Sequence, residues 1–445
     1  MLLINPSLDP FRKSPEKGDD ISNYVPLSII TVAQFYREQG RKVKVLDSRL
    51  YSSEDFVKLL KSEVMNHNTV GISVNTYTIH ESYVITKLLK SLGKKVIWGG
   101  VHPRLYPEQC KSIADEIITI DLKPRSLIPA YDLLDIEKYI KRVHKDNRIY
   151  RVLDIQFTRG CPYRCAFCIN PIFHGKKYTI PDIEDSKSAV KYIIEKYKLN
   201  HIVFLDENFF VNKNFATQII KSLPKGVTFT ADCRANYFEA FSPKLKSLLR
   251  EKCKMLFIGA ESGVQRILNL IKKDITVEDI WNANEECIDM NIIPNMSFII
   301  GLPTETIDEM KQTMDFMMSL RNRNPLFYYI PQQPFRPYPG CEIYDELKKK
   351  GFIKEPKKIE EWIKYIYEDS MPWIDSSTFS FLKKLVFYSS KARRMGNNTK
   401  SRIAYHISNF RIKNNLFLLP IELKFAKDYR KSWDKLIANK YLPED

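Results

Sequence analysis

The sequence contains few cysteines and no long apolar segment. Eight of its 445 residues are cysteine, and a disulfide framework is not expected in a chain of this size. No run of about 18 apolar residues occurs, so no membrane-spanning helix is expected. The N-terminal segment MLLINPSLDP has neither the positively charged start nor the cleavage site of a secretory signal. We therefore expect a cytoplasmic protein.

Signatures of nucleotide and nucleic-acid binding are also missing. No GxGxxG phosphate loop follows any expected strand, which disfavours NAD. No recognisable RNA-binding module and no second cysteine cluster occur, which argues against nucleic acid as a partner. The net charge of +17 would suit an anionic partner, but the lysines are spread along the chain instead of forming one tract.

Residues 1–121 alternate short apolar strands with amphipathic helices. The strands are expected in MLLINP, RKVKVLDSR, TVGISVNT, KKVIWGGVHP and EIITID. Such an alternation with short connections predicts an α/β domain with a doubly wound, Rossmann-like parallel sheet. Residues 122–150 contain prolines, mixed charges and no strand pattern, so we expect an interdomain linker there.

Residues 151–345 resume the strand–helix alternation. About six βα units fit this length, which predicts a partial (β/α)6 barrel. Ligands bind to both kinds of sheet at the carboxyl ends of the strands. Residues 346–445 are expected to form a helical C-terminal region in which basic residues are mixed with Phe, Tyr and Trp. This region could dock on an anionic membrane or pack as a helical cap on the barrel.

Three of the cysteines, at positions 161, 165 and 168, lie close together in the segment CPYRCAFC. Structural zinc usually takes four ligands from two CxxC-like pairs, and the sequence has no second pair. A [4Fe-4S] cluster needs four iron ligands, so three thiolates would leave one iron open for an outside ligand. A site-differentiated cluster fits this pattern best. Zinc with a remote fourth ligand and incidental thiols are the alternatives.

CPYRCAFC resembles the C-x3-C-x2-C signature of the radical S-adenosylmethionine (SAM) superfamily, including the aromatic Phe167 before the last cysteine. Further segments occur in the family's order, namely TRGCPYRCAFC, FLDENFF, IGAESG, FIIGLPTET and PYPGCEIYDE. The resemblance covers most of residues 1–345. It implies that Cys161, Cys165 and Cys168 hold a [4Fe-4S] cluster whose open iron binds SAM. One-electron reduction would then give a 5′-deoxyadenosyl radical.

The resemblance also implies SAM contacts at the strand ends. The implied SAM-binding residues are Phe167, Asp206, Glu207, Arg234, Glu261, Ser297 and Gly301. Asp206 would lie near the SAM amino group but could instead cap the next helix. Arg234 would pair with the SAM carboxylate or take part in an ion pair at the barrel rim. Gly301 would let the backbone approach the adenine, or would simply form a turn.

The N-terminal strands resemble those of the cobalamin-binding radical SAM family in the segments NP, PL, LDSR, VGISV and GGVHP. The candidate cobalamin contacts are Asn5, Ser73, Thr76, Gly99, Gly100 and His102. No DxHxxG-like segment occurs, so the resemblance suggests base-off cobalamin without a histidine below the cobalt. Relatives continue after the fifth strand with a Gly-Glu-Gly-Glu-like loop, whereas this chain passes directly from EIITID to LKPRS. One pocket wall is therefore missing or rebuilt, or the domain is vestigial.

The resemblance implies a radical SAM enzyme that methylates an unactivated carbon with the help of cobalamin. The alternatives are carbon–carbon or carbon–sulfur bond formation on a lipid or another small molecule, and modification of tRNA. A small-molecule or lipid substrate and an electron donor such as ferredoxin or flavodoxin are the expected partners. The basic C-terminal region adds peripheral membrane contact as an expectation.

Overall fold

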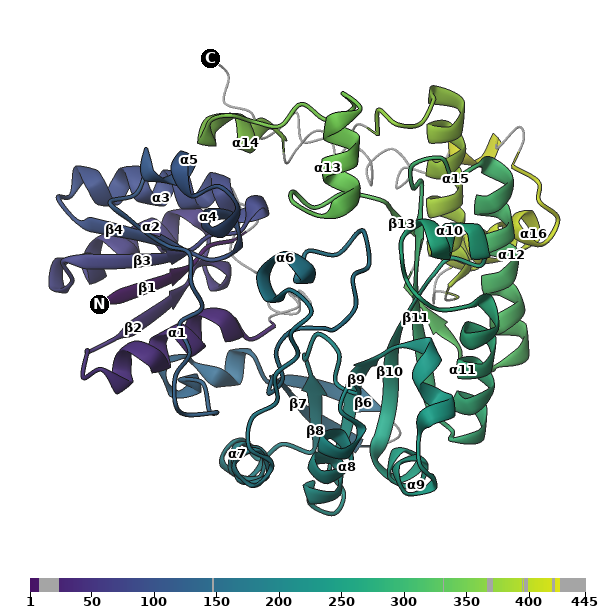
Figure 1. The fold of residues 1–445 in the computed structure, drawn as a ribbon, viewed down its shortest axis with the longest axis horizontal. Helices are drawn as coiled ribbons and strands as arrows, with labels where there is room; N and C mark the ends of the chain where they lie inside the picture. Colours follow the sequence, from purple (N-terminus) through teal and green to yellow (C-terminus); the bar gives the residue numbers. More distant parts are fainter. Residues whose placement is uncertain are drawn as a thin grey trace. The chain divides into compact units, whose positions relative to one another are not determined.

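The computed structural model describes residues 1–7, 24–145, 148–330, 332–365, 371–393, 395, 399–417 and 421–424. The chain forms two compact units (Figure 1). The N-terminal unit contains the described residues up to Asp154 together with residues 355–365. The barrel unit contains the other described residues, from Ile155 to Lys354 and from residue 371 onward.

The N-terminal unit is built on a five-stranded sheet in the order β2-β1-β3-β4-β5, in which all neighbours are parallel. The strands are β1 (Leu2–Asn5), β2 (Lys44–Asp47), β3 (Thr69–Ser73), β4 (Lys95–Gly99) and β5 (Glu116–Ile118). The strand order reverses between β1 and β3, and at such a point the carboxyl ends of the strands leave room for a ligand. The predicted doubly wound parallel sheet is confirmed.

Helices cover this sheet because their apolar stripes match the apolar strands. They are α1 (Leu27–Glu38), α2 (Ser53–Glu63), α3 (Ile79–Ser91), α4 (Val101–Leu105) and α5 (Pro107–Lys111), with the short 3-10 turns η1 (Ser48–Leu50), η2 (Val64–Asn66) and η3 (Thr76–Thr78). Trp98 of β4 lies fully buried in the core. Its indole N–H donates to Thr86 Oγ1 of α3 at 2.8 Å, so the core contains no unpaired indole.

Residues after β5 pack on the N-terminal unit. They form the 3-10 turns η4 (Tyr131–Leu133) and η5 (Ile136–Lys138), and the Ala130 amide donates to the Ile30 carbonyl of α1 at 3.1 Å. They also form β6 (Lys141–Lys145), antiparallel to β7 (Arg148–Ile155), although no strand was expected there. The strand was missed because its pairing leaves apolar side chains in solvent: Val143 is 47% and Ile149 is 51% exposed.

The barrel unit is built on strands β8 to β13 of an open sheet whose order is β12-β11-β10-β9-β8-β7-β6, with β13 beside β11. The remaining strands are β8 (His201–Phe204), β9 (Thr228–Cys233), β10 (Cys253–Glu261), β11 (Ile293–Ile300), β12 (Tyr328–Tyr329) and β13 (Gln333–Pro334). The strands from β8 to β12 pair in parallel. The expected partial barrel is therefore confirmed, and its carboxyl ends carry the motif residues.

Helices alternate with these strands and continue into the C-terminal region. They are α6 (Asn170–His174), α7 (Ile183–Tyr197), α8 (Lys213–Ser222), η6 (Ala235–Ala240), α9 (Pro243–Lys252), α10 (Gln265–Leu270), α11 (Val277–Asp289), α12 (Ile307–Arg323), α13 (Glu342–Lys349), α14 (Ile359–Tyr365), α15 (Ser376–Ala392), α16 (Thr399–Lys413) and η7 (Ile421–Lys424). The predicted helical C-terminal region is confirmed for the described residues, and residues 425–445 lie outside them. Among the described helices, none is long and apolar enough to span a membrane.

Candidate functional site

A cavity of about 350 Å³ opens at the carboxyl ends of the barrel strands. The sequence-predicted residues that line it are Cys161, Cys165, Cys168, Phe167, Glu207, Arg234, Glu261 and Ser297. Residues that sequence reasoning missed also line it, including Asn208, Asp232, Lys273 and Asn295. Thiols, carboxylates and cations from five segments of the barrel unit thus share one cavity, as a site for a zwitterionic ligand requires.

The cysteine loop follows β7 and is held in a tight conformation. The Cys168 amide donates to the Cys165 carbonyl at 3.0 Å, which closes a turn between the last two thiols. Gly160, before the first cysteine, has a φ of +82°, and a Cβ atom there would overlap the Lys177 carbonyl oxygen. Only glycine fits this position without moving the backbone.

Each of the three sulfurs accepts one N–H donor. Asn208 Nδ2 lies 3.7 Å from the Cys161 sulfur, and Arg234 Nη1 lies 3.7 Å from the Cys165 sulfur. The Asn170 amide lies 3.4 Å from the Cys168 sulfur. N–H donors favour thiolates, and they tune the potential of an iron–sulfur cluster. All three cysteines are free thiols.

Within the described ranges, no three His, Cys, Asp or Glu side chains converge as ligands of one ion. The three thiols line one cavity and each accepts an N–H donor. In this arrangement they would occupy three corners of a cubane.

The two carboxylates after β8 have different surroundings. Asp206 is fully buried and does not line the cavity. Its Oδ1 accepts from the amides of Phe157, at 3.1 Å, and Thr158, and burial raises its pKa to about 6. Glu207 faces the cavity, and its Oε2 accepts from the Gly160 amide at 3.2 Å. Asp206 is not a helix cap either, because Asn212 caps α8.

Arg234 extends from the end of β9 with its charge unneutralised by any carboxylate among the described residues. Its guanidinium lies 3.6 Å from the centre of the Tyr163 ring, a cation–π contact. Its Nη2 donates to the Lys273 carbonyl, and the side chain is 6% exposed. The rim ion pair considered as an alternative is therefore not formed, and a buried cation faces the cavity without a counter-charge.

Glu261 forms a buried ion pair at the end of β10. Its Oε1 lies 2.7 Å from Lys273 Nζ, and the two side chains are 7% and 8% exposed. Ser297 Oγ donates to its Oε2 at 3.4 Å. The strand register shifts between Gly259 and Glu261, and Glu261 has a φ of +64°. This bulge re-aims the carboxylate into the cavity.

Gly259 makes room for this ion pair. A Cβ atom at this position would lie 2.6 Å from Lys273 Nζ and closer still to Glu261 Oε1. Lys273 itself lies in the turn after α10, in a segment whose two lysines gave no indication of burial. Both Gly259 and Glu261 line the cavity, but the register shift between them breaks the strand alternation, so sequence spacing gave no signal for Gly259.

Asp232, which lies on β9 two residues before Arg234, also lines the cavity. Across the sheet it stands in register with Phe257, which in turn pairs with Asn295, and all three line the cavity. Burial, together with the nearby Asp206 and Glu207, raises its pKa to about 7. Asn295 is 5% exposed, and its side-chain oxygen has no hydrogen-bond partner. Strand alternation from Arg234 would have pointed to Asp232.

Gly301 lies outside the cavity lining. It has a φ of +79°, and its amide donates to Glu305 Oε2 at 2.6 Å. Its carbonyl accepts from the Trp373 indole N–H at 2.8 Å, and a Cβ atom would lie 2.6 Å from Met371 Cε. The C-terminal region therefore packs directly on this turn.

All candidate cobalamin residues except Asn5, which ends β1, lie at or just after the carboxyl ends of β3 and β4. The Val74 amide donates to the Gly99 carbonyl at 2.7 Å, and the His102 amide donates to the Val74 carbonyl at 3.1 Å. Gly100 has a φ of +109°, and a Cβ atom there would lie 2.6 Å from the Val74 carbonyl oxygen. Ser73 is half-buried at the end of β3. The two strand ends are thus joined by backbone hydrogen bonds.

His102 is fully buried in this conformation. A hydrogen bond of 3.1 Å joins its Nδ1 to Thr76 Oγ1, whereas its Nε2 has no partner. Burial lowers its pKa to about 3, so the imidazole is neutral. Its ring contacts Tyr106 and Trp362 at centroid distances of 5.2 Å and 5.1 Å. Sequence reasoning did not foresee this aromatic enclosure.

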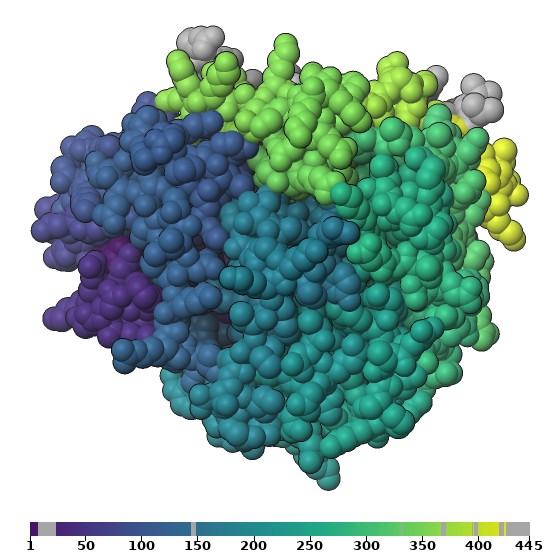
Figure 2. All heavy atoms as spheres, viewed as in Figure 1, coloured from purple at the N-terminus to yellow at the C-terminus, as the bar shows by residue number. Residues whose placement is uncertain are grey.

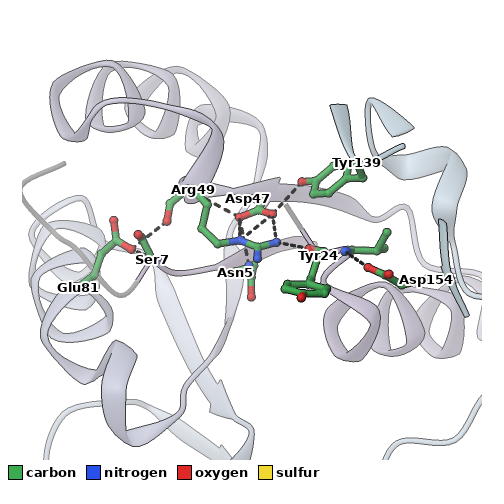
Figure 3. Close-up of polar contacts among 10 residues, drawn as sticks. Asn5, Ser7, Tyr24, Asp47, Arg49, Glu81, Tyr139 and Asp154 are labelled. Atoms are coloured by element: carbon green, nitrogen blue, oxygen red, sulfur yellow. Dashed lines mark hydrogen bonds and ion pairs between the residues drawn. The ribbon is translucent and has the colours of Figure 1, made fainter. Parts of the chain in front are cut away.

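The LDSR motif forms a polar cluster at the ends of β1 and β2 (Figure 3). Arg49 Nη2 lies 2.6 Å from Asp47 Oδ2, and the Asp47 side chain is fully buried. Tyr139 Oη donates to the same Asp47 oxygen at 2.7 Å, and Asn5 Nδ2 donates to Oδ1 at 3.1 Å. Asn5 and Tyr139 thus meet at Asp47, which links β1 and β2 to the segment after β5.

Comparison with protein families identifies two domains. Residues 155–317 match the model of the radical SAM superfamily, and residues 22–120 match that of the B12 binding domain. The first match contains the cysteine loop and the strand ends around the cavity. The second contains β2 to β5 and the candidate residues Ser73, Thr76, Gly99, Gly100 and His102.

Several curated relatives are methyltransferases. An uncharacterized methyltransferase of Pyrococcus horikoshii is 27% identical over 414 residues, which cover 81% of this chain and 86% of the relative. The bacteriochlorophyllide d C-8(2)-methyltransferase of Chlorobaculum tepidum is 26% identical over 335 residues, covering 67% and 72%. The anaerobic magnesium-protoporphyrin IX monomethyl ester cyclase of Rubrivivax gelatinosus is 25% identical over 233 residues, covering 50% and 39%.

Two solved structures share the fold. The cobalamin-dependent SAM radical enzyme OxsB, with aqua-cobalamin and SAM bound, matches with a TM-score of 0.62 at 14% identity, over 98% of this chain and 79% of OxsB. The radical SAM methyltransferase TsrM from Kitasatospora setae, with cobalamin and a [4Fe-4S] cluster bound, matches with a TM-score of 0.60 at 14% identity, over 93% and 99%.

Proposed function

The chain belongs to the cobalamin-binding-domain-containing radical SAM family, and from that premise we propose that it methylates an unactivated carbon of a small organic substrate. In this proposal it cleaves SAM reductively to a 5′-deoxyadenosyl radical. The observation that carries the proposal is the cavity in which three N–H-bonded thiols meet a carboxylate and an uncompensated arginine. When bound, the cluster supplies the electron and the corrinoid carries the methyl group.

The side chains around the cavity match the charges of SAM. Glu207, close to the cysteine loop, would accept from the SAM ammonium group. Arg234, which lacks a carboxylate partner, would pair with the SAM carboxylate in a charge-assisted bond. Glu261, which Lys273 holds at 2.7 Å, would accept from the ribose hydroxyls together with Ser297. Phe167 would exclude water from the sulfonium.

In this proposal, two of the residues that the family resemblance implies for SAM binding, Asp206 and Gly301, do not contact SAM directly. Asp206 would hold the start of the cysteine loop through the amides of Phe157 and Thr158. Gly301 would shape the turn after β11 through its hydrogen bonds to Glu305 and Trp373. Neither residue lines the cavity.

The N-terminal unit would hold the corrinoid at the carboxyl ends of its strands, where doubly wound sheets bind ligands. Ser73, Gly99 and Gly100 lie at these ends. The buried His102 ring packs against Tyr106 and Trp362, and its Nδ1 is hydrogen-bonded to Thr76, so in this conformation it would not reach a bound corrinoid. The arrangement supports a corrinoid held without a histidine below the cobalt.

A second reaction type is supported by one relative. Because the Rubrivivax gelatinosus cyclase closes a ring, bond formation without methyl transfer is the alternative proposal. A reductant of the ferredoxin or flavodoxin class would serve either reaction. Product analysis with SAM labelled in its methyl group separates the two, because only methyl transfer places the label in the product.

We also propose peripheral contact of the C-terminal region with an anionic bilayer. Ile403 and Phe410 of α16 are 54% and 60% exposed, and Lys400 and Lys413 are exposed beside them. The helix contains no acidic residue, which suits a negatively charged surface. In a flotation assay, the protein should rise with phosphatidylglycerol vesicles and should not rise with phosphatidylcholine vesicles. Equal flotation of Phe410→Ser would contradict the proposal.

Anaerobic reconstitution tests the main proposal. The protein is loaded with iron, sulfide, SAM and hydroxocobalamin and then desalted, and its absorption spectrum is recorded. The proposal predicts that one [4Fe-4S] cluster and one corrinoid stay with each chain. Retention of the cluster without corrinoid would leave a radical SAM enzyme of the alternative reaction type. Retention of neither would overturn the assignment.

A further inference from the structure

The N-terminal unit is discontinuous in sequence. The chain enters the barrel unit at Ile155, leaves it after Lys354, and contributes residues 355–365 to the N-terminal unit. These residues, here called the strap, include α14, which packs against α3 (Figure 1). Figure 2 shows strap atoms, in green, lying directly against the blue atoms of this unit.

The strap inserts its apolar residues into the core of the sheet domain. Ile359 and Trp362 are 1% and 0% exposed and belong to the same cluster as Trp98 and Leu89. The Trp362 ring meets His102 edge-on at 5.1 Å and Tyr106 at 4.8 Å between centroids. A tryptophan buried to this degree belongs to the fold of the unit.

Four hydrogen bonds fix the orientation of the strap on the rest of the N-terminal unit. The Trp362 indole N–H donates to Gln109 Oε1 at 2.8 Å, and Gln109 Nε2 donates back to the Pro356 carbonyl at 3.1 Å. Tyr106 Oη donates to Glu355 at 2.8 Å, and Tyr83 Oη donates to Glu360 at 2.9 Å. Both ends of the strap are thus fixed to the N-terminal unit.

The partners of the strap follow the end of β4. His102 and Tyr106 belong to α4 or flank it, and Gln109 belongs to α5. Each of these helices is five residues long. The Trp362 ring packs edge-on against the His102 ring, and Thr76 Oγ1 is hydrogen-bonded to His102 Nδ1. The strap therefore fixes the position of the loop that begins at Gly99.

We propose that the strap supports the wall of the corrinoid site from behind, without contacting the ligand, and that Trp362 is its positioning residue. The inference rests on the proposed function, because it assumes that the loop from Gly99 to His102 borders the corrinoid. Trp362 would act through His102, holding the two strand ends in the shape that the ligand needs. Such pre-organisation strengthens binding without a direct contact.

The test compares Trp362→Ala and Trp362→Phe with the wild type, each as the full chain reconstituted with its cluster. Hydroxocobalamin affinity is measured by equilibrium dialysis, and SAM cleavage in the barrel unit is the second readout. Trp362→Ala should weaken corrinoid binding by about tenfold or more and leave SAM cleavage unchanged. Trp362→Phe keeps an aromatic ring against His102 and should restore most of the affinity.

A matched control separates positioning from general destabilisation. Phe56→Leu loosens the same core from α2, in which Phe56 is 2% exposed. If Phe56→Leu lowers the free energy of unfolding as much as Trp362→Ala does, it should still leave corrinoid affinity within about twofold of the wild type. An equal loss of affinity in both variants, or an unchanged affinity in Trp362→Ala, would overturn the inference.

A gentler variant covers the case in which Trp362→Ala fails to fold. Tyr106→Phe with Glu355→Gln removes the hydrogen bond between these two side chains and keeps the aromatic ring, and it should speed corrinoid release while the melting temperature stays within error. An unchanged release rate would overturn the inference. A wild-type protein that binds SAM but no corrinoid would instead refute the cobalamin part of the proposed function, a result distinct from the behaviour of these variants.

Discussion

The buried ion pair between Glu261 and Lys273 offers the sharpest test of the site geometry. Lys273→Met removes the cation and keeps a side chain of similar length. Glu261 Oε1 lies 2.7 Å from Lys273 Nζ, with both side chains under one-tenth exposed. Removing one partner of such a pair costs about 3–5 kcal/mol, because the other charge stays buried and uncompensated. Since the cavity admits water to Glu261, we expect the lower end, about 3 kcal/mol.

Urea unfolding of the wild type and of Lys273→Met measures this cost. The double variant Lys273→Met with Glu261→Gln should recover at least half of the lost stability, because no charge is then left uncompensated. SAM affinity should fall about tenfold in the single variant and should not recover in the double variant, which lacks the carboxylate. A single variant within about 1 kcal/mol of the wild type would refute the reasoning, because a surface pair behaves in that way.

Three further predictions concern single residues. Asp232 has its pKa raised to about 7, so the folded state binds an extra proton between about pH 4 and pH 7 and loses stability as the pH rises through that range. Asp232→Asn should therefore gain about 4 kcal/mol over the wild type at pH 8 relative to pH 4 in urea unfolding; a pH-independent difference would contradict this. Gly259→Ala should push Lys273 from Glu261 and weaken SAM binding about tenfold by calorimetry, whereas unchanged binding would show that the pair can shift freely. Asp47→Asn should destabilise the N-terminal unit by about 3 kcal/mol, while Tyr139→Phe costs about 1 kcal/mol; equal costs would argue against a buried charge.

Strand patterns predicted the sheet architecture because buried parallel strands are short apolar runs between turn residues. The same logic missed β6, whose pairing buries little apolar surface. It also treated residues 122–150 as a linker, although Tyr131 and Tyr139 are 1% exposed. A segment without a periodic hydrophobic pattern gives no local sign of whether its side chains pack against a core.

Motif reasoning brought the three cysteines, Glu207, Arg234 and Glu261 to one cavity, because strand ends of a barrel share an edge. It could not separate Asp206 from Glu207, since neighbouring residues at a strand end differ only in direction. Lys273 and Trp362 were out of reach for another reason. Trp362 contacts His102 from a distant part of the chain, and Lys273 reaches Glu261 across α10 and a turn, 12 residues away. No local pattern records either contact.

Release of 5′-deoxyadenosine on anaerobic reduction tests the central claim most directly. The claim predicts that the reconstituted wild type releases the nucleoside from SAM, and that Cys161→Ala, Cys165→Ala and Cys168→Ala each abolish release and lower iron content. Cys287→Ala, which removes a fully buried thiol from α11, is the matched control and should retain both. Undiminished nucleoside release and iron in the three loop variants would contradict the account.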